Sequence, residues 1–268
     1  MITINFSCKS TIGLVRKNNE DNFYCNGEML ISQENYSLNG FARTPCIFAV
    51  CDGMGGESNG ELASLTAVNV LDEYAENIKL AALSSKNVDE TVQLYISAAN
   101  KKICNVMREN SFRMGTTLAL VVIAGDFIRA YNIGDSRIYK AQNNILSRIS
   151  EDHTIADQKI KMGLLTQEQA RHDKSKHVLT RCLGIFEHEM ILTPYVVPPF
   201  VVNDNLRLLL CSDGLTDMLS DSQIRDIIFA NKDTRTTANV LINAALHNGG
   251  RDNITCIIID IQNKGEIN

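Results

Sequence analysis

Residues 116–141 read TTLALVVIAGDFIRAYNIGDSRIYKA, and this stretch decides the fold class. It contains three runs rich in Val, Ile and Leu, at 116–124, 127–133 and 137–141, which are typical of β-strands. Short turns separate the runs, such as Gly125-Asp126 between the first two. Connections this short join antiparallel neighbours, because parallel strands need a crossover of a dozen or more residues. The stretch therefore predicts an antiparallel sheet.

Further strands and helices are predicted on both sides of this stretch. Residues 2–8 alternate polar and apolar side chains with a period of two, which indicates a half-buried strand. Continuous apolar runs predict three more strands, at 46–51, 206–211 and 254–261. Apolar residues at helical spacing predict three helices, which include residues 68–78, 92–106 and 238–245. Because each helix must bury its apolar stripe against a sheet or another helix, the predicted fold class is α+β.

Composition places the chain among globular proteins of one domain. Its 268 residues, 44% of them hydrophobic, are enough to bury a sizeable core. The net charge of -5 comes from mixed charges rather than blocks, so neither a nucleic-acid surface nor a polybasic membrane anchor is expected. We expect a single domain over residues 1–268, working as a monomer, with an exposed polar hairpin or loop at 27–44.

Three features predict a cytoplasmic location. Residues 1–17 lack the apolar core of a secretory signal. The longest apolar run, at 118–124, is far shorter than the roughly 18 residues that a transmembrane helix needs. The eight cysteines are scattered without a C-x-x-C pair, which indicates free thiols in a reducing compartment.

Acidic residues follow the ends of several predicted strands. They form four sites, each beside a glycine or an amide-rich turn: Glu20-Asp21, Asp52-Gly53, Asp213-Gly214 and Asp252-Asn253. One such site alone is usually a turn. Four carboxylate sites brought together would repel one another, and the usual remedy is a hard divalent cation with oxygen ligands. Because no Cys or His stands at these strand ends, Mg²⁺ or Mn²⁺ is favoured over zinc or copper.

Arg16 stands four residues before Glu20. Its planar guanidinium matches the oxygens of a phosphate, so an arginine beside metal ions indicates a phosphorylated substrate. The alternative is a surface ion pair between Arg16 and an acidic neighbour.

Eight short motifs, taken in order, resemble those of the metal-dependent protein phosphatases, the type 2C serine/threonine phosphatases, in their bacterial form. The resemblance runs from about residue 4 to residue 261. The motifs are Gly13…Arg16…Asn19-Glu20-Asp21, Asp52-Gly53-Met54-Gly55-Gly56, Met114-Gly115-Thr116-Thr117, Gly134-Asp135-Ser136-Arg137, Asp152-His153-Thr154, Leu179-Thr180-Arg181-Cys182-Leu183-Gly184, Ser212-Asp213-Gly214-Leu215-Thr216-Asp217 and Gly250-Arg251-Asp252-Asn253-Ile254-Thr255.

This resemblance implies a fold, an activity and two cofactor ions. The implied fold is a four-layer α-β-β-α sandwich, in which two central antiparallel sheets are flanked by helices. The implied activity is hydrolysis of phosphoserine and phosphothreonine in proteins that a serine/threonine kinase has modified. Two tightly bound Mn²⁺ or Mg²⁺ ions would activate a water molecule for direct attack on phosphorus, without a covalent intermediate.

The resemblance also implies roles for particular residues. The implied metal ligands are Asp52 for both ions, the Gly53 carbonyl and Glu20 near one ion, and Asp213 and Asp252 for the other. Asp21 would order metal-bound water, and Arg16 would hold the substrate phosphate. Asp135 would bind a third, weaker ion together with Asp213; its alternative is a residue needed only for the hairpin turn.

Two features of the resemblance leave the mechanism open. Many eukaryotic members carry a histidine, a candidate general acid, where this chain has Met54. His153 is a conceivable substitute, and the alternative is a packing or capping histidine. Residues 155–177 match the position of the family's flap beside the catalytic cleft, and their basic run at 171–177 is either a partner contact or a solvated helix end.

Two other functions compete with the phosphatase. A catalytically inactive relative would bind phosphoproteins, although it need not keep all these buried carboxylates together. A hydrolase of small phosphoesters is a second rival, and the lack of a nucleotide-binding P-loop pattern argues against a nucleotide substrate.

Overall fold

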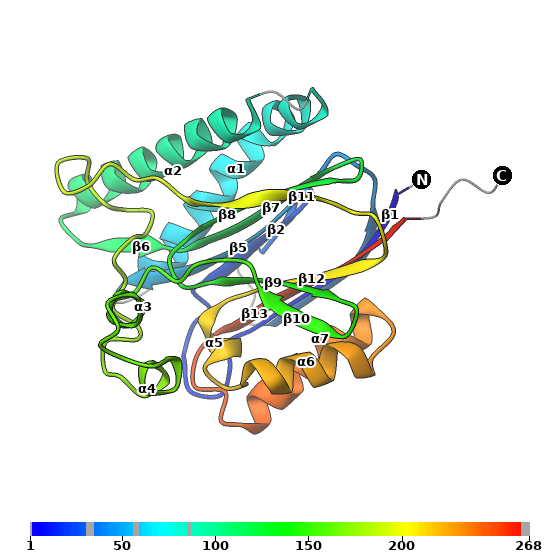
Figure 1. The fold of residues 1–268 in the computed structure, drawn as a ribbon. Coiled ribbons are helices and arrows are strands. Elements are labelled where there is room, and N and C mark those ends of the chain that lie inside the picture. The colour runs from blue at the N-terminus through cyan, green and yellow to red at the C-terminus, as the bar shows by residue number, and fades with distance from the viewer. Residues whose placement is uncertain (1, 31–34, 56–58, 85–86, 264–268) are drawn as a thin grey trace.

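The computed structural model describes residues 2–30, 35–55, 59–84 and 87–263 of the chain. Two antiparallel sheets form its centre (Figure 1). The strands of the first sheet are β1 (Ile2–Thr11), β4 (Asn35–Ala42), β9 (Arg137–Gln142), β10 (Ile145–Arg148), β12 (Leu206–Cys211) and β13 (Ile254–Asn263). The strands of the second are β2 (Asp21–Cys25), β3 (Glu28–Met29), β5 (Cys46–Gly55), β6 (Met114–Thr116), β7 (Leu118–Ala124), β8 (Phe127–Ile133) and β11 (Tyr195–Val201).

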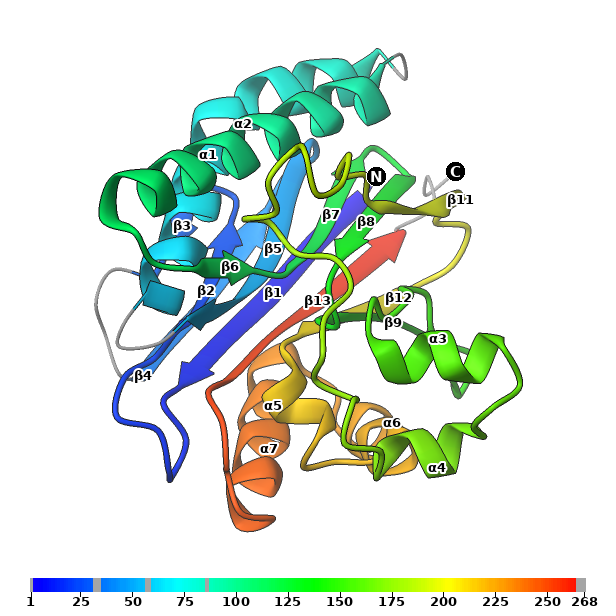
Figure 2. The same cartoon turned by 90° about the vertical axis from the view of Figure 1, so that its left-hand side faces the viewer.

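Strand order confirms the hairpins that the sequence predicts. The first sheet has the order β10-β9-β12-β13-β1-β4, and the second has the order β11-β8-β7-β5-β2-β3, with β6 paired to β5. The β7–β8 hairpin pairs Leu118 with Ile133 and Ala124 with Phe127. In the first sheet β1 pairs with β13 along its whole length, which brings the two ends of the described chain side by side (Figure 2).

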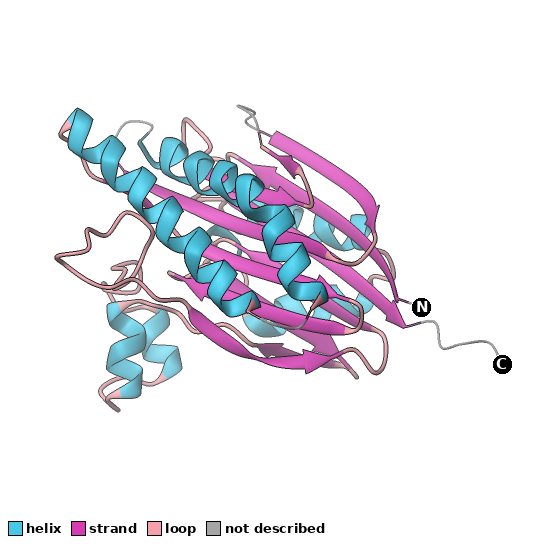
Figure 3. Ribbon diagram, turned by 90° about the horizontal axis from the view of Figure 1, so that it is seen from above, coloured by secondary structure: helices cyan, strands magenta, loops and turns pink. Residues whose placement is uncertain are grey.

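Helices cover both outer faces of the sandwich, as Figure 3 shows from above. The long helices α1 (Asn59–Leu83) and α2 (Val88–Asn110) pack on the second sheet. The first sheet carries α6 (Asp221–Ala230) and α7 (Thr234–His247), with the short α5 (Asp213–Thr216) at the end of β12. The predicted α+β class and the four-layer sandwich are therefore confirmed.

The apolar runs of the central strands are buried on both faces. In β5, Phe48 and Val50 point between the sheets, whereas Ile47, Ala49 and Cys51 face α1 and α2. A strand with a helix layer on one side and a second sheet on the other has no polar face, which explains why its sequence is continuously apolar.

The sequence did not predict the strands at the sheet edges. The 27–44 segment, predicted to be an exposed hairpin or loop, contains β3 and the edge strand β4, while residues 31–34 lie outside the described ranges. Exposed and half-buried residues alternate along most of β4. An edge strand that buries one face only in part lacks the apolar run that marks a central strand.

Residues 155–177, which match the position of the family's flap, contain two short helices. They carry α3 (Ile155–Lys161) and α4 (Gln167–Arg171), each with a threonine N-cap. The excursion leaves the sandwich after Thr154 and returns at Leu179, and these two residues form an isolated β-bridge. Both short helices lie near α5 and α6 beyond the strand ends (Figure 2).

Candidate metal centre

The acidic residues predicted from the sequence meet in one cleft at the end of the sandwich. Its volume is about 620 Å³. The predicted site residues that line it are Arg16, Glu20, Asp52, Gly53, Asp135, Asp213 and Asp252. Because these residues come from five separate parts of the chain, only the fold brings them together.

Each of these carboxylates lies at or close to the end of a strand. Asp52 lies near the end of β5, opposite Asp21 at the start of β2. Asp213 begins α5 directly after β12, and Asp252 lies just before β13. Asp135 follows β8, after a turn in which Gly134 has a φ of 92°. Antiparallel neighbours end and begin at the same rim, so these carboxylates converge there.

Glycines permit two close backbone approaches at the cleft. A Cβ atom on Gly53 would lie 2.1 Å from the carbonyl oxygen of Gly60 and 2.5 Å from that of Glu20. Gly13 has a φ of 81°, and a Cβ there would lie 2.2 Å from the carbonyl oxygen of Asp252. Any larger residue would separate the segments that carry Glu20 and Asp252 from their neighbours.

Asn253 is a structural residue of the site that the sequence did not single out for a role. Its side-chain oxygen accepts a hydrogen bond from the Glu20 N–H at 2.8 Å. Its side-chain nitrogen donates to the carbonyls of Ile12 and Asn18. This buried amide therefore ties the loop that carries Arg16 to the start of β13.

Burial and charge repulsion both raise the pKa values of carboxylates in the cleft. Burial, followed by the charges of Asp21 and Asp213, raises the pKa of Asp52 well above its ordinary value. Burial and the charge of Asp213 raise the pKa of Asp135 in the same direction. Burial also raises the pKa of Glu20.

This donor set fits divalent cations. Asp135 and Asp213 each offer an oxygen, and His177 a nitrogen, with the three atoms all within 4.8 Å of one another. Carboxylates that repel one another in a buried site need a positive charge between them, and oxygen donors suit Mg²⁺ or Mn²⁺. The residues present therefore fit the predicted ions.

Asp21 lies behind the cleft rather than on its wall. The side chain is 2% exposed, and its Oδ2 accepts a hydrogen bond from the Ser212 hydroxyl at 2.7 Å. Burial raises the pKa of Asp21 to about 7, against the lowering effect of that hydrogen bond. Any effect on water in the cleft must pass through neighbours such as Asp52.

Arg16 reaches the cleft from the loop between β1 and β2. One guanidinium nitrogen lies 2.7 Å from Asp252 Oδ2, and the arginine side chain is 50% exposed. The predicted alternative, an ion pair with an acidic neighbour, is therefore present. An ion pair this exposed is weak, so the guanidinium remains available to an anion in the cleft.

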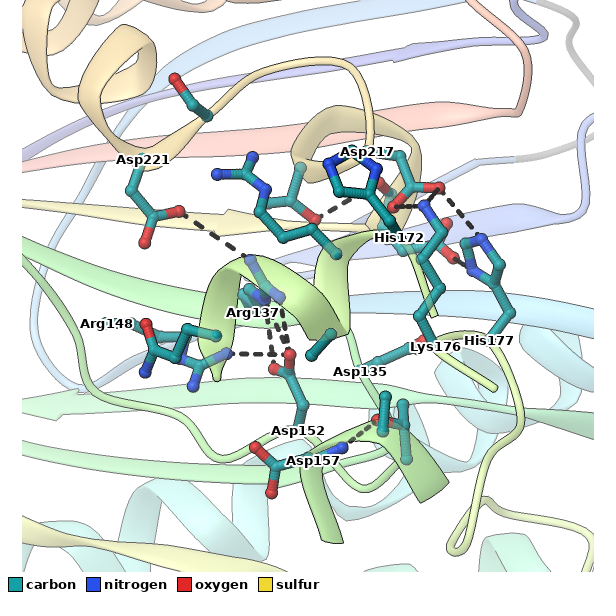
Figure 4. Close-up of a pocket in the computed structure, with 18 of the residues that line it drawn as sticks. Asp135, Arg137, Arg148, Asp152, Asp157, His172, Lys176, His177, Asp217 and Asp221 are labelled. Atoms are coloured by element: carbon teal, nitrogen blue, oxygen red, sulfur yellow. Dashed lines mark hydrogen bonds and ion pairs between the residues drawn. The ribbon is translucent and has the colours of Figure 1, made fainter. Parts of the chain in front are cut away.

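Three residues at the cleft were not assigned from the sequence. Lys176 Nζ lies 3.1 Å from Asp217 Oδ1, and His177 Nε2 lies 3.2 Å from Asp217 Oδ2 (Figure 4). His177 Nδ1 also lies 3.1 Å from Asp213 Oδ2. These contacts join the end of the 155–177 excursion to α5. Asp217 follows Asp213 by four residues, a helical spacing that places both on one face.

His153 does not line the cleft. It is 5% exposed, and its Nδ1 accepts a hydrogen bond from the Gly134 N–H at 3.1 Å. Burial lowers the pKa of His153 to about 4. A buried, neutral histidine bonded to the backbone has the packing role that the sequence offered as the alternative to a proton donor.

Comparison with known proteins identifies the family of this chain. The family described as Protein phosphatase 2C matches residues 30–247. A serine/threonine phosphatase named stp, from Listeria monocytogenes serotype 4b, is 34% identical over 260 residues, which cover 94% of this chain and 95% of that relative. The chain belongs to the protein phosphatase 2C family.

Solved structures give the same result. The crystal structure of the Mycobacterium tuberculosis serine/threonine phosphatase PstP is similar with a TM-score of 0.81 and 27% identity, covering 97% of this chain and all of that one. A second structure holds the PstP catalytic domain in complex with two manganese ions; its TM-score is 0.76, with 28% identity over 98% of this chain and all of that one.

Proposed function

We propose that this protein is a protein serine/threonine phosphatase that uses Mn²⁺ or Mg²⁺ to hydrolyse phosphoserine and phosphothreonine. The observation that carries the proposal is the convergence of Arg16 with the predicted carboxylates in a single cleft. The two manganese ions in the PstP structure support the choice of cofactor.

Each of these residues would have its own role in catalysis. Asp52, Asp213, Asp252, Glu20 and the Gly53 carbonyl would hold two ions, and Asp135 with Asp213 a weaker third one. Bound there, the ions would neutralise phosphate charge and lower the pKa of a water molecule towards neutrality. Arg16 would bind and orient the phosphate, and Asp21 would hold Ser212 and the base of the site in place.

Several wider properties belong to the same proposal. We expect residues 1–268 to act as one catalytic domain whose 155–177 flap borders the cleft, and as a monomer that removes the phosphates added by a serine/threonine kinase. The eight cysteines are all free, which supports a reducing, cytoplasmic compartment. No helix in the described ranges is long and apolar enough to cross a membrane.

Phosphate release from a phosphothreonine peptide tests the proposal. The protein should release phosphate with Mn²⁺ present and none with an excess of chelator. Peptide binding without release at any Mn²⁺ concentration would instead favour the inactive phosphoprotein-binding relative. Turnover of small phosphoesters alone would favour the small-molecule hydrolase.

A further inference from the structure

A second cavity adjoins the catalytic cleft, and the proposed chemistry does not use it. Its volume is about 860 Å³. We call it the flap groove, because α3 and α4 form one wall, while the end of α5, the link to α6 and the start of α6 form another; Arg137 and Arg148 also line it (Figure 4). A cavity of this size fits a short stretch of polypeptide.

The flap groove and the cleft are continuous. Asp135, His177 and Asp217 line both cavities. The pairs that Lys176 and His177 form with Asp217 lie where the two cavities meet. A phosphorylated residue in the cleft would therefore place its neighbours along the chain, at about 3.3–3.6 Å per extended residue, within reach of the flap groove.

Four carboxylates of the flap groove away from the metal centre already have lysine or arginine partners. Asp152 Oδ2 lies 2.7 Å from Arg137 and 2.8 Å from Arg148. The remaining pairs are Asp157 with Lys161 at 2.9 Å, Asp217 with Lys176 at 3.1 Å, and Asp221 with Arg137 at 3.9 Å. Lysine and arginine side chains thus offset the negative charge of these four carboxylates.

Two arginines of the flap groove lack such a partner. Arg171, at the end of α4, and Arg251, next to Asp252, line the groove. Neither forms an ion pair with a carboxylate of the described residues, and both are exposed. Each therefore offers the groove a guanidinium that makes no ion pair within the described chain. Guanidinium groups suit carboxylate and phosphate ligands.

We propose that the flap groove binds an anionic side chain of the phosphoprotein, either a carboxylate or a second phosphate, a few residues from the phosphorylated Ser or Thr. This proposal rests on the proposed phosphatase function. It assigns Arg171 to substrate selection, because its charge lies on the flap side of the groove and away from the metal ligands.

Matched phosphothreonine peptides test the flap groove. One residue, two to five positions before or after the phosphothreonine, is Ala, Asp or a second phosphothreonine, and kcat/KM is measured with Mn²⁺. We expect at least a threefold preference for an anionic residue over Ala at one or more positions, and this preference should shrink as salt is added. The Asp and phosphothreonine peptides show which anion is favoured.

Variants locate the preference in the groove. Arg171→Gln should reduce the ratio of anionic to Ala peptide towards one, and Arg171→Lys should keep part of it. Arg225→Gln is the control, because Arg225 lies on α6, pairs with Asp226 and does not line the groove. No preference at any position in the parent, or an equal loss in Arg225→Gln, would overturn the proposal.

Direct binding separates this proposal from the phosphatase function. If no peptide is dephosphorylated, the phosphatase assignment fails, and the groove is tested by fluorescence anisotropy with a labelled Asp-rich peptide. Weaker binding to Arg171→Gln than to Arg225→Gln supports the groove. Equal binding to both variants rules it out.

Discussion

Burying several carboxylates around Asp52 carries an energetic cost that a bound cation removes. Burial, followed by the charges of Asp21, Asp213 and Asp135, raises the pKa of Asp52, so in the absence of cations these neighbouring carboxylates oppose its ionisation. Divalent ions reverse this balance because they favour the charged form of every ligand.

Replacing Asp52 with Asn therefore has a clear expected outcome. Asp52→Asn should weaken Mn²⁺ binding in calorimetric titration and lower phosphopeptide turnover by at least about 100-fold, since each factor of ten is about 1.4 kcal/mol of barrier. The fold should persist in circular dichroism. A correctly folded variant with the parent's Mn²⁺ affinity and rate would show that Asp52 is not a metal ligand.

Replacing Arg16 should weaken substrate binding more than it slows the chemical step. Arg16→Ala should raise KM for a phosphopeptide about tenfold, because charge-assisted hydrogen bonds contribute roughly 1.5–3 kcal/mol, with a smaller loss in kcat. Arg16→Lys should restore only part of the affinity, since the ammonium lacks the planar fork. Lys17→Ala is the matched control, because Lys17 is exposed on the same loop and does not line the cleft.

Replacing Asp135 tests the proposed third, weaker metal site. Asp135→Ala should leave two tight Mn²⁺ sites in calorimetric titration and lower phosphopeptide turnover about tenfold. Loss of the tight sites or of the fold would mean that Asp135 is structural. Unchanged turnover would mean that a third ion is dispensable.

At the level of elements, the flap is joined to the sandwich by few contacts. Within it, Lys159 Nζ lies 3.0 Å from Asp173 Oδ1. Towards α5, Asp217 accepts hydrogen bonds from Lys176 at 3.1 Å and also pairs with His177. Short helices without a large apolar face depend on such polar contacts for their position, so Asp217 should decide how firmly the flap is held.

Removing the charge of Asp217 tests this anchor. Asp217→Asn should increase hydrogen exchange over residues 155–178, and tryptic cleavage there about fivefold, the equivalent of roughly 1 kcal/mol. Asp226→Asn removes an exposed carboxylate of α6 as a control. Identical exchange and cleavage in the parent and in Asp217→Asn would show that other contacts hold the flap.

At the level of the whole molecule, His153 links stability to pH. The folded state holds the pKa of His153 at about 4, below its ordinary 6.5, because burial opposes the charged ring and the charge of Arg181 repels it. The unfolded chain therefore binds the proton more tightly. The stability due to His153 is complete above pH 6.5 and falls, by about 2–3 kcal/mol, as the pH drops towards 4.

Comparison with a variant that does not titrate isolates this effect. His153→Gln keeps a side-chain oxygen that can accept from Gly134, so its free energy of unfolding should fall less between pH 7.5 and pH 4.5. Urea denaturation in the presence of a chelator gives the free energy of unfolding of both proteins at each pH. The acidic cluster is the same in both proteins, so its contribution cancels when the two free energies are subtracted. Equal pH slopes in both proteins would refute the role assigned to His153.

Across the whole molecule, some secondary-structure elements could be predicted from the sequence and others could not. The β7–β8 hairpin followed from two apolar runs joined by a short turn, and the buried face of α2 followed from apolar residues at helical spacing. The edge strands β4 and β11 did not, since their residues are only partly buried. The prolines of β11, Pro198 and Pro199, lie where its register with β8 shifts, a position that the strand pattern cannot reveal.

The carboxylate sites were predictable one by one, as acidic residues at the ends of apolar strands, and the ordered motifs identified the family. Sequence alone therefore determined the fold class, the metal-ligand types and the phosphoryl chemistry, because these depend on local periodicity and on the chemistry of side chains. Only the tertiary structure decided that Asp21 lies behind the cleft, that Asp217 pairs with Lys176, and that Arg171 borders a second cavity. These contacts join residues that are far apart in the chain, and the packing of the layers determines which of them meet.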